Sequence, residues 1–541
     1  MARLDPMNPP SPVAEPVLAG NLYSLLAAGF ESRLDSPFLR VPGQAALTYR
    51  SVVDRSAQMA GVLVGLGVTV GDRVAVQIDK STDNVALYLA CLRVGGVFLP
   101  LNTAYTEAEV RFFVDDATPK VVIARPGTLV DLGHAHDIGG PGPTVMHLGA
   151  DGTGSFADAA NGAVPVDSVV VRAPEDSAAM LYTSGTTGRS KGAVLTHGCL
   201  ASNALALHEI WNFGPDDVLL HTLPIFHVHG LFVALHCAML SGNEVIFLRR
   251  FDVDSVLDHL SEATVLMAVP TQHSRLLDDL RFNAEACRSI RLFTSGSAPL
   301  TVAMHHAFTA RTGHEILERY GMTEAGMITS NPYDGDRVPG TVGFALPGVD
   351  IRIRKDRASL HEAALATADE TGVVEIRSAG LFAGYWQLPD KTDAAYTDDG
   401  WFVTGDVGSL DAEGRLTLEG RMSDMIISGG YNIYPKEIEM VLDRQPGIFE
   451  TAVIGVPHAD FGEAVVAVVV RTDSTDSTDS TDSADSAEAT LHEDLSAALD
   501  GVLARFKHPK RYLEANELPR NSMAKVQKAA LRTEHADLFS E

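Results

Sequence analysis

The first 330 residues alternate short apolar runs with amphipathic stretches, and this alternation constrains the fold more than any other feature. Strands that alternate with helices build βαβ units, whose strands pair in parallel. The sequence therefore predicts an α/β fold, with a large N-terminal domain of parallel sheets flanked by helices. Predicted strands span residues 73–78, 244–248, 265–269 and 290–294, and predicted helices span residues 84–94, 253–260 and 302–312.

The pattern changes twice in the remainder of the chain. Residues 341–420 hold strands and Gly-rich turns, which predicts a β-rich subdomain. A smaller α+β unit follows, with a helix at 435–442 that has proline at a tolerated first-turn position, and strands at 451–456 and 464–471. We predict two domains, residues 1–421 and 422–541.

One segment of the second domain has low complexity. Residues 472–486 repeat Thr-Asp-Ser, with no apolar side chain larger than alanine and an aspartate at every third position. Such a segment cannot bury enough surface to offset its conformational entropy. We predict a disordered Asp-rich insertion, with an interaction tail as the functional alternative.

The charge balance narrows the classes of partner. The chain has 42 Lys and Arg against 70 Asp and Glu, a formal net charge of −28. This argues against broad binding to nucleic acid or docking on an anionic membrane. No apolar run is long enough to span a bilayer, and the N-terminus has neither signal-peptide nor transit-peptide character. Four cysteines lie far apart without a CxxC pair, so we expect a cytoplasmic protein.

The first segment with chemical character spans residues 181–192, where small hydroxylated residues alternate with glycine. Such a loop lets backbone N–H groups and hydroxyls surround phosphate oxygens, and Lys191 or Arg189 adds charge. The spacing is not that of a Walker loop. Taken alone, the segment fits a plain turn equally well.

Three further segments follow in order. In residues 319–324, Thr323 and Glu324 could hold a phosphate and Mg²⁺, since hard cations prefer carboxylate oxygen. In residues 401–406, Asp406 at a strand end could take both ribose hydroxyls, and Gly420 and Arg421 follow it. Lys525 lies on a short loop near the C-terminus. Each segment in isolation fits a turn, a hairpin or a surface residue.

Together, these four segments resemble the adenylate-forming superfamily of acyl-CoA synthetases, luciferases and stand-alone adenylation domains. The resemblance runs from about residue 22 to residue 531. It implies that a carboxylic acid reacts with MgATP to give an acyl-adenylate and pyrophosphate, and that a thiol, usually that of CoA, then displaces AMP. The cofactors implied are ATP, Mg²⁺ and CoA.

The resemblance also implies roles for individual residues. Tyr320 and Gly321 would lie near adenine, Thr323 would contact the α-phosphate, and Glu324, a catalytic residue, would bind Mg²⁺. The β- and γ-phosphates would be held by Thr183, which is also catalytic, Ser184, Gly185, Thr186, Thr187, Gly188 and Lys191.

The remaining roles lie farther along the chain. Asp406 and Arg421 would hold the ribose, and Lys525 would bridge the attacking carboxylate and the α-phosphate. The second domain would rotate about residues 421–424 between the two half-reactions, moving Lys525 out and bringing Gly429 and Gly430 toward pantetheine.

Two positions depart from the family pattern. Ser423 stands where the family usually has Asp or Lys, and Ala524 stands where Gly is usual. Neither change removes a reacting group. Both bear on the kinetics of domain closure.

The acyl site has its own segments. Residues 223–230 match the family region that lines it, with His227 at the pocket mouth as a catalytic and substrate-binding residue. A metal pair formed by His227 and His229 is disfavoured because no third ligand is evident. Arg275 is either an exposed helix residue or a bidentate clamp for a second substrate carboxylate.

Residues 290–299, 316–324, 329–340 and 456–463 resemble malonyl-CoA synthetases. In that group an arginine at the position of Arg275 pairs with the free carboxylate, with Ser297 nearby at the substrate and cofactor sites, and Met327 is expected at the substrate site. A buried cation would reject plain fatty acids. Residues 272–274 depart from the group's pattern, which leaves room for methylmalonate or another short acid.

We therefore predict ATP-dependent ligation of a small dicarboxylic acid, malonate or methylmalonate, to CoA. Four alternatives stay open: a ligase for another short- or medium-chain acid, a stand-alone enzyme that loads a carrier protein, a nucleotide-binding protein that has lost catalysis, and a luciferase-like oxygenase. Lys525, Glu324 and Asp406 argue against lost catalysis. The resemblance to malonyl-CoA synthetases disfavours the oxygenase.

Overall fold

The computed structural model of the chain describes residues 20–128, 142–183, 190–355, 364–428, 431–458, 460–472, 493–521 and 525–539, without the side chains of residues 423, 431 and 432. The predicted insertion, apart from residue 472, lies outside this description. So do Ala524 and seven of the predicted site residues: Ser184, Gly185, Thr186, Thr187, Gly188, Gly429 and Gly430.

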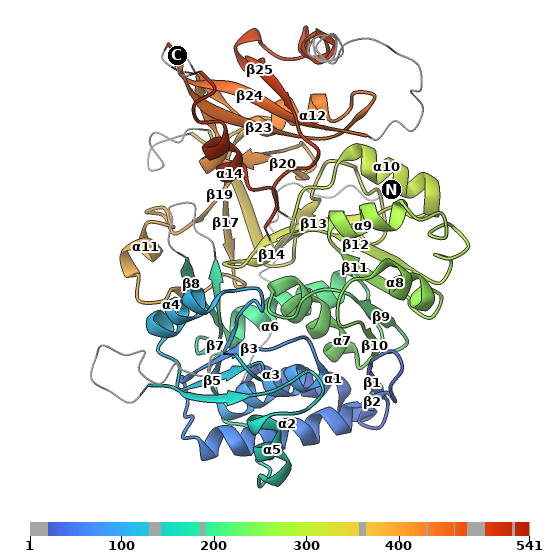
Figure 1. The fold of residues 1–541 in the computed structure, drawn as a ribbon, viewed down its shortest axis with the longest axis vertical. Helices are drawn as coiled ribbons and strands as arrows, with labels where there is room; N and C mark the ends of the chain where they lie inside the picture. The colour runs from blue at the N-terminus through green and yellow to red at the C-terminus, as the bar shows by residue number, and fades with distance from the viewer. Residues whose placement is uncertain are drawn as a thin grey trace, which may run out of the picture.

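Two parallel sheets dominate the first 330 residues, as predicted (Figure 1). The first has the order β18-β8-β7-β4-β3-β5-β6, in which β7, β4, β3, β5 and β6 run parallel, and β8 pairs antiparallel with both β7 and β18. Its strands are β3 Arg73–Gln77, β4 Val97–Pro100, β5 Val121–Ala124, β6 Thr144–His147, β7 Ser177–Thr183, β8 Lys191–Thr196 and β18 Gly384–Tyr385.

The second sheet has the order β15-β14-β13-β12-β11-β9-β10-β1-β2 and is parallel from β13 to β1. It contains the three strands predicted near residues 244, 265 and 290. Its strands are β1 Pro37–Arg40, β2 Leu47–Thr48, β9 Val218–His221, β10 Glu244–Phe247, β11 Val265–Ala268, β12 Leu292–Ser295, β13 Leu317–Met322, β14 Gly326–Ser330 and β15 Phe344–Ala345.

Helices cover the two sheets, and their ends follow local capping chemistry. The predicted helix at 84–94 begins two residues earlier, because the Ser81 side chain caps it, and it ends at Gly95 in the left-handed conformation. A π-helical segment, His229–Leu235, leads into α7. The helices are α1 Leu22–Phe30, α2 Tyr49–Gly65, α3 Thr82–Val94, α4 Glu107–Ala117, α5 Ser155–Gly162, α6 His197–Ile210, α7 His236–Ser241, α8 Val253–Leu260, α9 Pro270–Leu277 and α10 Val302–Thr312.

The region after residue 341 is rich in strands, as predicted. Four antiparallel strands form a sheet in the order β16-β17-β19-β20. They are β16 Val349–Arg354, β17 Gly372–Ser378, β19 Phe402–Leu410 and β20 Leu416–Arg421, and the short helix α11 spans Pro389–Asp393.

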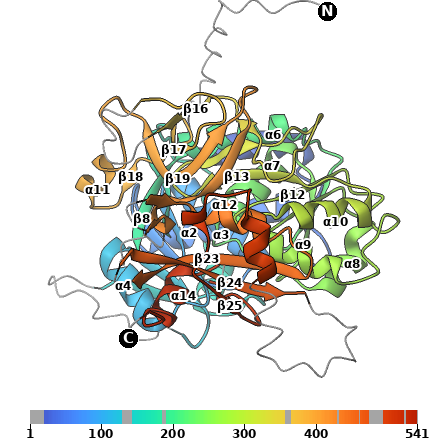
Figure 2. The same ribbon diagram turned by 90° about the horizontal axis from the view of Figure 1, so that it is seen from above.

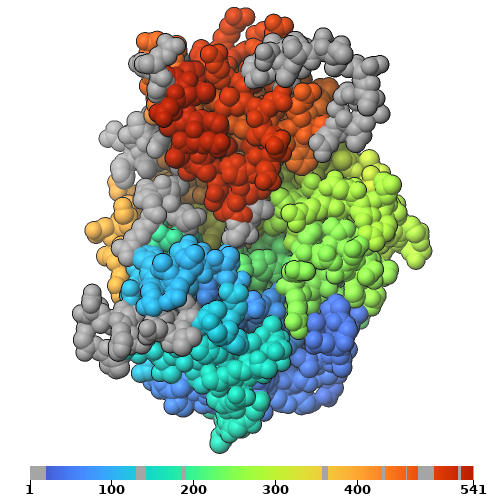
Figure 3. All heavy atoms as spheres, in the orientation of Figure 1, coloured from blue at the N-terminus to red at the C-terminus, as the bar shows by residue number. Residues whose placement is uncertain are grey.

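A smaller α+β unit follows the 3₁₀ turn at Met422–Asp424. Its sheet has the order β22-β21-β24-β23, with β25 paired to β24, and it has two hydrophobic clusters drawn only from residues 426–539. Figures 2 and 3 show this unit seated on the larger part of the chain. Its elements include β21 Ile426–Ser428, β22 Tyr431–Ile433, α12 Pro435–Leu442, β23 Ile448–His458, β24 Gly462–Arg471, β25 Arg511–Glu514 and α14 Lys528–Glu534.

Within the described residues, no helix is both long and apolar enough to cross a bilayer.

Candidate active site

The carboxylate of Glu324, in the turn between β13 and β14, forms the first part of the candidate site. Its side chain is buried, at 7% exposure. Tyr385 donates its hydroxyl to Glu324 Oε1 at 3.0 Å, and Thr183 Oγ1 lies 3.5 Å from the same oxygen. Lys191 Nζ lies 4.1 Å from the centre of the Tyr385 ring. The structure thus places both ends of the Gly/Thr-rich loop beside Glu324.

A second group forms where β13, β19 and β20 meet. Asp406 is 4% exposed and is paired in register with Arg421. The Tyr320 hydroxyl donates to Asp406 Oδ2, and Arg421 Nε lies 3.0 Å from Asp406 Oδ1. Burial and the nearby Asp406 raise the pKa of Tyr320, and Asp406 raises the pKa of Arg421. The carboxylate is therefore held in a fixed orientation at the strand edge.

Lys525, from the smaller unit, is coupled electrostatically to both groups. Its side chain is solvent accessible, yet it lies among protein atoms, and this desolvation is the largest cause that lowers its pKa. Arg421 and Arg319 lower the pKa further, whereas Asp406 and Glu324 raise it. A lysine about two hundred residues from Glu324 in sequence thus acts electrostatically on the same site.

His227 and His229 follow β9 in the chain, and the charges of the same site act on them. His227 is half-buried, and burial together with Lys525 and Arg319 lowers its pKa to about 3, so it is neutral at pH 7. His229 is buried, and its Nδ1 lies 3.4 Å from Ser297 Oγ. Ser297 has a φ of 71°, a conformation that is strained for a residue with a Cβ and is typical of functional sites.

Close backbone packing holds the β13–β14 hairpin. A Cβ on Gly321 would lie 2.3 Å from the carbonyl oxygen of Gly326, so only glycine fits there. The Asn203 amide side chain bonds to both backbone groups of the buried Met327, at 3.1 and 2.9 Å. These two bonds fix the backbone of Met327, which belongs to β14 of the hairpin.

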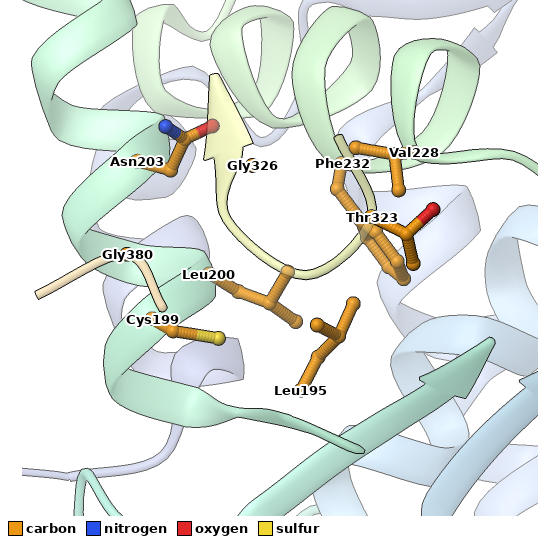
Figure 4. A pocket seen from close by; sticks show the side chains of 9 residues that line it. All are labelled: Leu195, Cys199, Leu200, Asn203, Val228, Phe232, Thr323, Gly326 and Gly380. Carbon is orange, nitrogen blue, oxygen red and sulfur yellow. The ribbon is translucent and has the colours of Figure 1, made fainter. Parts of the chain in front are cut away.

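A small cavity adjoins the hairpin (Figure 4). Thr323 extends toward Val228 and Phe232, and all three lie across the cavity from the lining residues of α6. The cavity is lined by Leu195, Cys199, Leu200, Asn203, Val228, Phe232, Thr323, Gly326 and Gly380.

Arg275 does not fulfil the expectation of a buried cation. It lies on α9, whose buried residues are Pro270, His273 and Leu276, and it is exposed to solvent. Its helical position places it off the face that packs on the core. The helical pattern alone left both orientations open.

Two residues with a place in the site were missed from the sequence. Tyr385, on the short strand β18, contacts Glu324 and Lys191. Arg319, on β13, is a fully buried cation close to the histidines. No strand is predicted at residues 317–322 from the sequence, so no signal for the burial of Arg319 was available.

Glu324 is the candidate metal ligand among the described residues of the site. Among the described residues, no three His, Cys, Asp or Glu side chains converge as a ligand set. The buried Glu324 carboxylate, with the hydroxyls of Thr183 and Tyr385 beside it, supplies the hard oxygen atoms that suit Mg²⁺. These oxygen atoms would suit a magnesium ion.

Comparison with known proteins decides the family. The AMP-binding enzyme family matches residues 29–386, and the AMP-binding enzyme C-terminal domain matches residues 437–525. The chain belongs to the AMP-binding enzyme family. The matches cover both the larger part of the chain and the smaller α+β unit that carries Lys525.

Three relatives are informative. The mitochondrial malonate–CoA ligase of Mus musculus is 36% identical over 524 residues, covering 90% of this chain and 86% of the relative. A long-chain-fatty-acid–CoA ligase of Mycobacterium tuberculosis is 33% identical over 496 residues, covering 91% and 93%. The crystal structure of ATP-bound MatB from Rhodopseudomonas palustris superimposes with a TM-score of 0.88 at 47% identity, covering 96% of this chain and all of MatB. The fold prediction is therefore confirmed.

Proposed function

We propose that the chain is an AMP-forming acid–thiol ligase that joins malonate to CoA through an acyl-adenylate. Relatives named malonate–CoA ligases from mammals and from Arabidopsis thaliana, at 33–36% identity, support this proposal. The observation that supports it is that the charges of Asp406, Glu324 and Arg319 all act on the pKa of Lys525. Contacts to Tyr385 and Arg421 hold the Glu324 and Asp406 carboxylates in place. The site thus offers fixed positive charge for a dicarboxylate and for a nucleotide.

The nucleotide would bind where the two acidic groups lie. Asp406 would accept the ribose hydroxyls, with Arg421 and Tyr320 fixing its orientation. Thr183 and Lys191 would contact the β- and γ-phosphates, and Thr323 the α-phosphate. Magnesium would be held by Glu324 and would neutralise charge on the pyrophosphate.

In the first half-reaction, a carboxylate oxygen of the acid attacks the α-phosphorus of ATP. The bond from that phosphorus to the bridging oxygen breaks, and pyrophosphate leaves with the electron pair. The Lys525 ammonium would lie between the attacking carboxylate and the α-phosphate. Catalysis here is positioning and fixed charge, because no protein group forms a covalent bond.

In the second half-reaction, the CoA sulfur attacks the acyl carbon of the adenylate, and AMP leaves as the thioester forms. The smaller unit would rotate about the turn at Met422–Asp424, so we propose a domain boundary between residues 421 and 422. The separate hydrophobic clusters of residues 426–539 support a unit that moves as a body. Arg532 of this unit contacts the turn, because its Nη2 donates a hydrogen bond to the carbonyl oxygen of Asp424 at 3.2 Å.

An acid panel tests the proposal. Malonate, methylmalonate, succinate, acetate and octanoate are each supplied with ATP, Mg²⁺ and CoA, and release of AMP is measured. We expect the highest kcat/KM with malonate. Octanoate as the best substrate would instead support the function of the long-chain relative, and adenylation without CoA transfer would support loading of a carrier protein.

A further inference from the structure

A lysine and a histidine connect the two parallel sheets. Lys80 lies in the turn between β3 of the first sheet and α3, and His221 is the last residue of β9 in the second sheet. Lys80 Nζ lies 2.7 Å from His221 Nδ1 and donates to the His221 carbonyl oxygen at 2.9 Å. His221 Nε2 lies 2.9 Å from the carbonyl oxygen of Gly230. We call these contacts the Lys80–His221 link.

The carbonyl group of Gly230 fixes where the proton of the histidine ring lies. A carbonyl oxygen can only accept, so His221 Nε2 carries the hydrogen. His221 is 1% exposed, and burial together with the charge of Lys80 lowers its pKa well below the usual value, so the ring is neutral at pH 7. Its Nδ1 therefore accepts from Lys80 Nζ. The link has one direction, from Lys80 through His221 to Gly230.

Lys80 occupies a position that is costly for a lysine. Its Nζ lies 4.4 Å from the centre of the Phe247 ring, and desolvation lowers the pKa of Lys80 well below its usual value. No acidic group among the described residues offsets this effect. Taking an ammonium group out of water is unfavourable unless its hydrogen bonds compensate. The bonds to His221 are the compensation that the structure shows.

The segment at the far end of the link carries side chains of the acyl site. Gly230 belongs to the π-helical segment that begins at His229, and π-helical turns are frequent at functional sites. An added Cβ on Gly230 would lie 2.1 Å from the carbonyl oxygen of Pro224, so the backbone packs closely there. His227 and His229 precede Gly230, and Phe232 after it lines the cavity in Figure 4. A shift of Gly230 would move these side chains.

We propose that Lys80 and His221 are positioning residues for the acid substrate. The link holds the carbonyl group of Gly230, and through it the orientation of His227 and His229. Neither Lys80 nor His221 contacts the substrate. The role in acid binding rests on the proposed function, whereas the link itself is a property of the fold. Breaking the link should weaken binding of the acid and leave the nucleotide site, which is built on other strands, unchanged.

Four variants separate the link from general packing. Lys80→Met removes the donors but keeps an apolar stem, and His221→Phe keeps a ring but removes both of its bonds. His221→Gln keeps an acceptor and a donor on one planar group. The matched control is Tyr88→Phe, because the Tyr88 hydroxyl lies 2.8 Å from Nε2 of another buried histidine, His236, and both rings pack against Phe232.

The assay measures KM for ATP and for the best acid of the panel, expected to be malonate, from release of AMP. We expect Lys80→Met and His221→Phe each to raise the KM for the acid about tenfold, the effect of one lost hydrogen bond, and to change the KM for ATP less than about twofold. His221→Gln and Tyr88→Phe should keep both values within about threefold of wild type. The variant with both Lys80→Met and His221→Phe should match the single variants, since all three break one link.

Two measurements do not depend on activity. Melting temperatures should fall to a similar extent in His221→Phe and Tyr88→Phe, because each loses a buried hydrogen bond. Heteronuclear NMR of ring-labelled histidine reads the link without substrate, and the signals of His221 are identified by their absence in His221→Gln. We expect a neutral ring with its proton on Nε2 at pH 7.

Several outcomes would overturn the inference. They are equal rises in KM for the acid and for ATP, an effect of His221→Gln or Tyr88→Phe as large as that of His221→Phe, and a double variant whose KM for the acid rises about 100-fold, as independent contributions would give. A His221 ring that is charged or protonated on Nδ1 would also overturn it. A wild-type protein that activates no acid of the panel would remove the proposed function, while NMR would still decide whether the link exists. The two failures are therefore distinguishable.

Discussion

Replacing Lys525 by alanine should separate the two half-reactions. Lys525 is influenced by two acidic groups, Asp406 and Glu324, and by two cations, Arg421 and Arg319. These opposing influences mean that no protein group alone acts as its counterion. We expect the ammonium group to act mainly on the reacting carboxylate and the α-phosphate, and its loss to be felt in the first step.

The magnitude follows from its environment. Loss of one preorganised donor to a developing charge costs about 2.7–4 kcal/mol of barrier, or about 10²–10³ in rate. Lys525 is solvent accessible, and water screens its charge, so the lower end of this range applies. We expect malonate-dependent exchange of labelled pyrophosphate into ATP to fall about 100-fold.

The assay compares that exchange with AMP release after CoA is added to preformed malonyl-adenylate. The second reaction should change little, since Lys525 would have moved away. Lys510→Ala is the control, because Lys510 is an exposed lysine of the same unit that lies over the Phe461 ring. Undiminished exchange in Lys525→Ala, or an equal loss in Lys510→Ala, would refute the reasoning.

Three further predictions concern Lys525, Asp406 and Glu375. The pKa of Lys525 is lowered, so adenylation should decline as pH rises through a value below 10.5, and the pH–rate profile of Lys525→Ala should lack this alkaline decline. Asp406→Asn should raise the KM for ATP about tenfold by weakening charged hydrogen bonds to the ribose; an unchanged KM would remove Asp406 from the nucleotide site. Glu375→Gln should lower the free energy of unfolding by about 3–5 kcal/mol, measured by urea denaturation, because the buried Arg354 would lose the carboxylate charge that its Nε contacts at 2.7 Å.

Local signals in the sequence were sufficient for many elements. The helix predicted at residues 302–312 has the predicted ends, because Thr301 caps its first turn and Gly313 ends it in the left-handed conformation. The strand predicted at 290–294 lies at Leu292–Ser295 instead. Ile290 is buried like a strand residue. The strand nevertheless begins at Leu292, because Leu292 is the first residue of this segment that pairs with β11, opposite Val265. Hydrophobicity reports burial, whereas strand ends depend on register.

The sequence by itself determined the alternation of strands and helices, the β-rich region that follows, and the motifs that contain Glu324, Asp406 and Lys525. These depend on short-range chemistry: periodicity, caps and residue type. Only the tertiary structure decided which arginine is buried. Arg275 lies on the open face of a helix, and Arg319 lies in a strand covered on both sides. Charge is visible in a sequence, but its solvation depends on what packs around it.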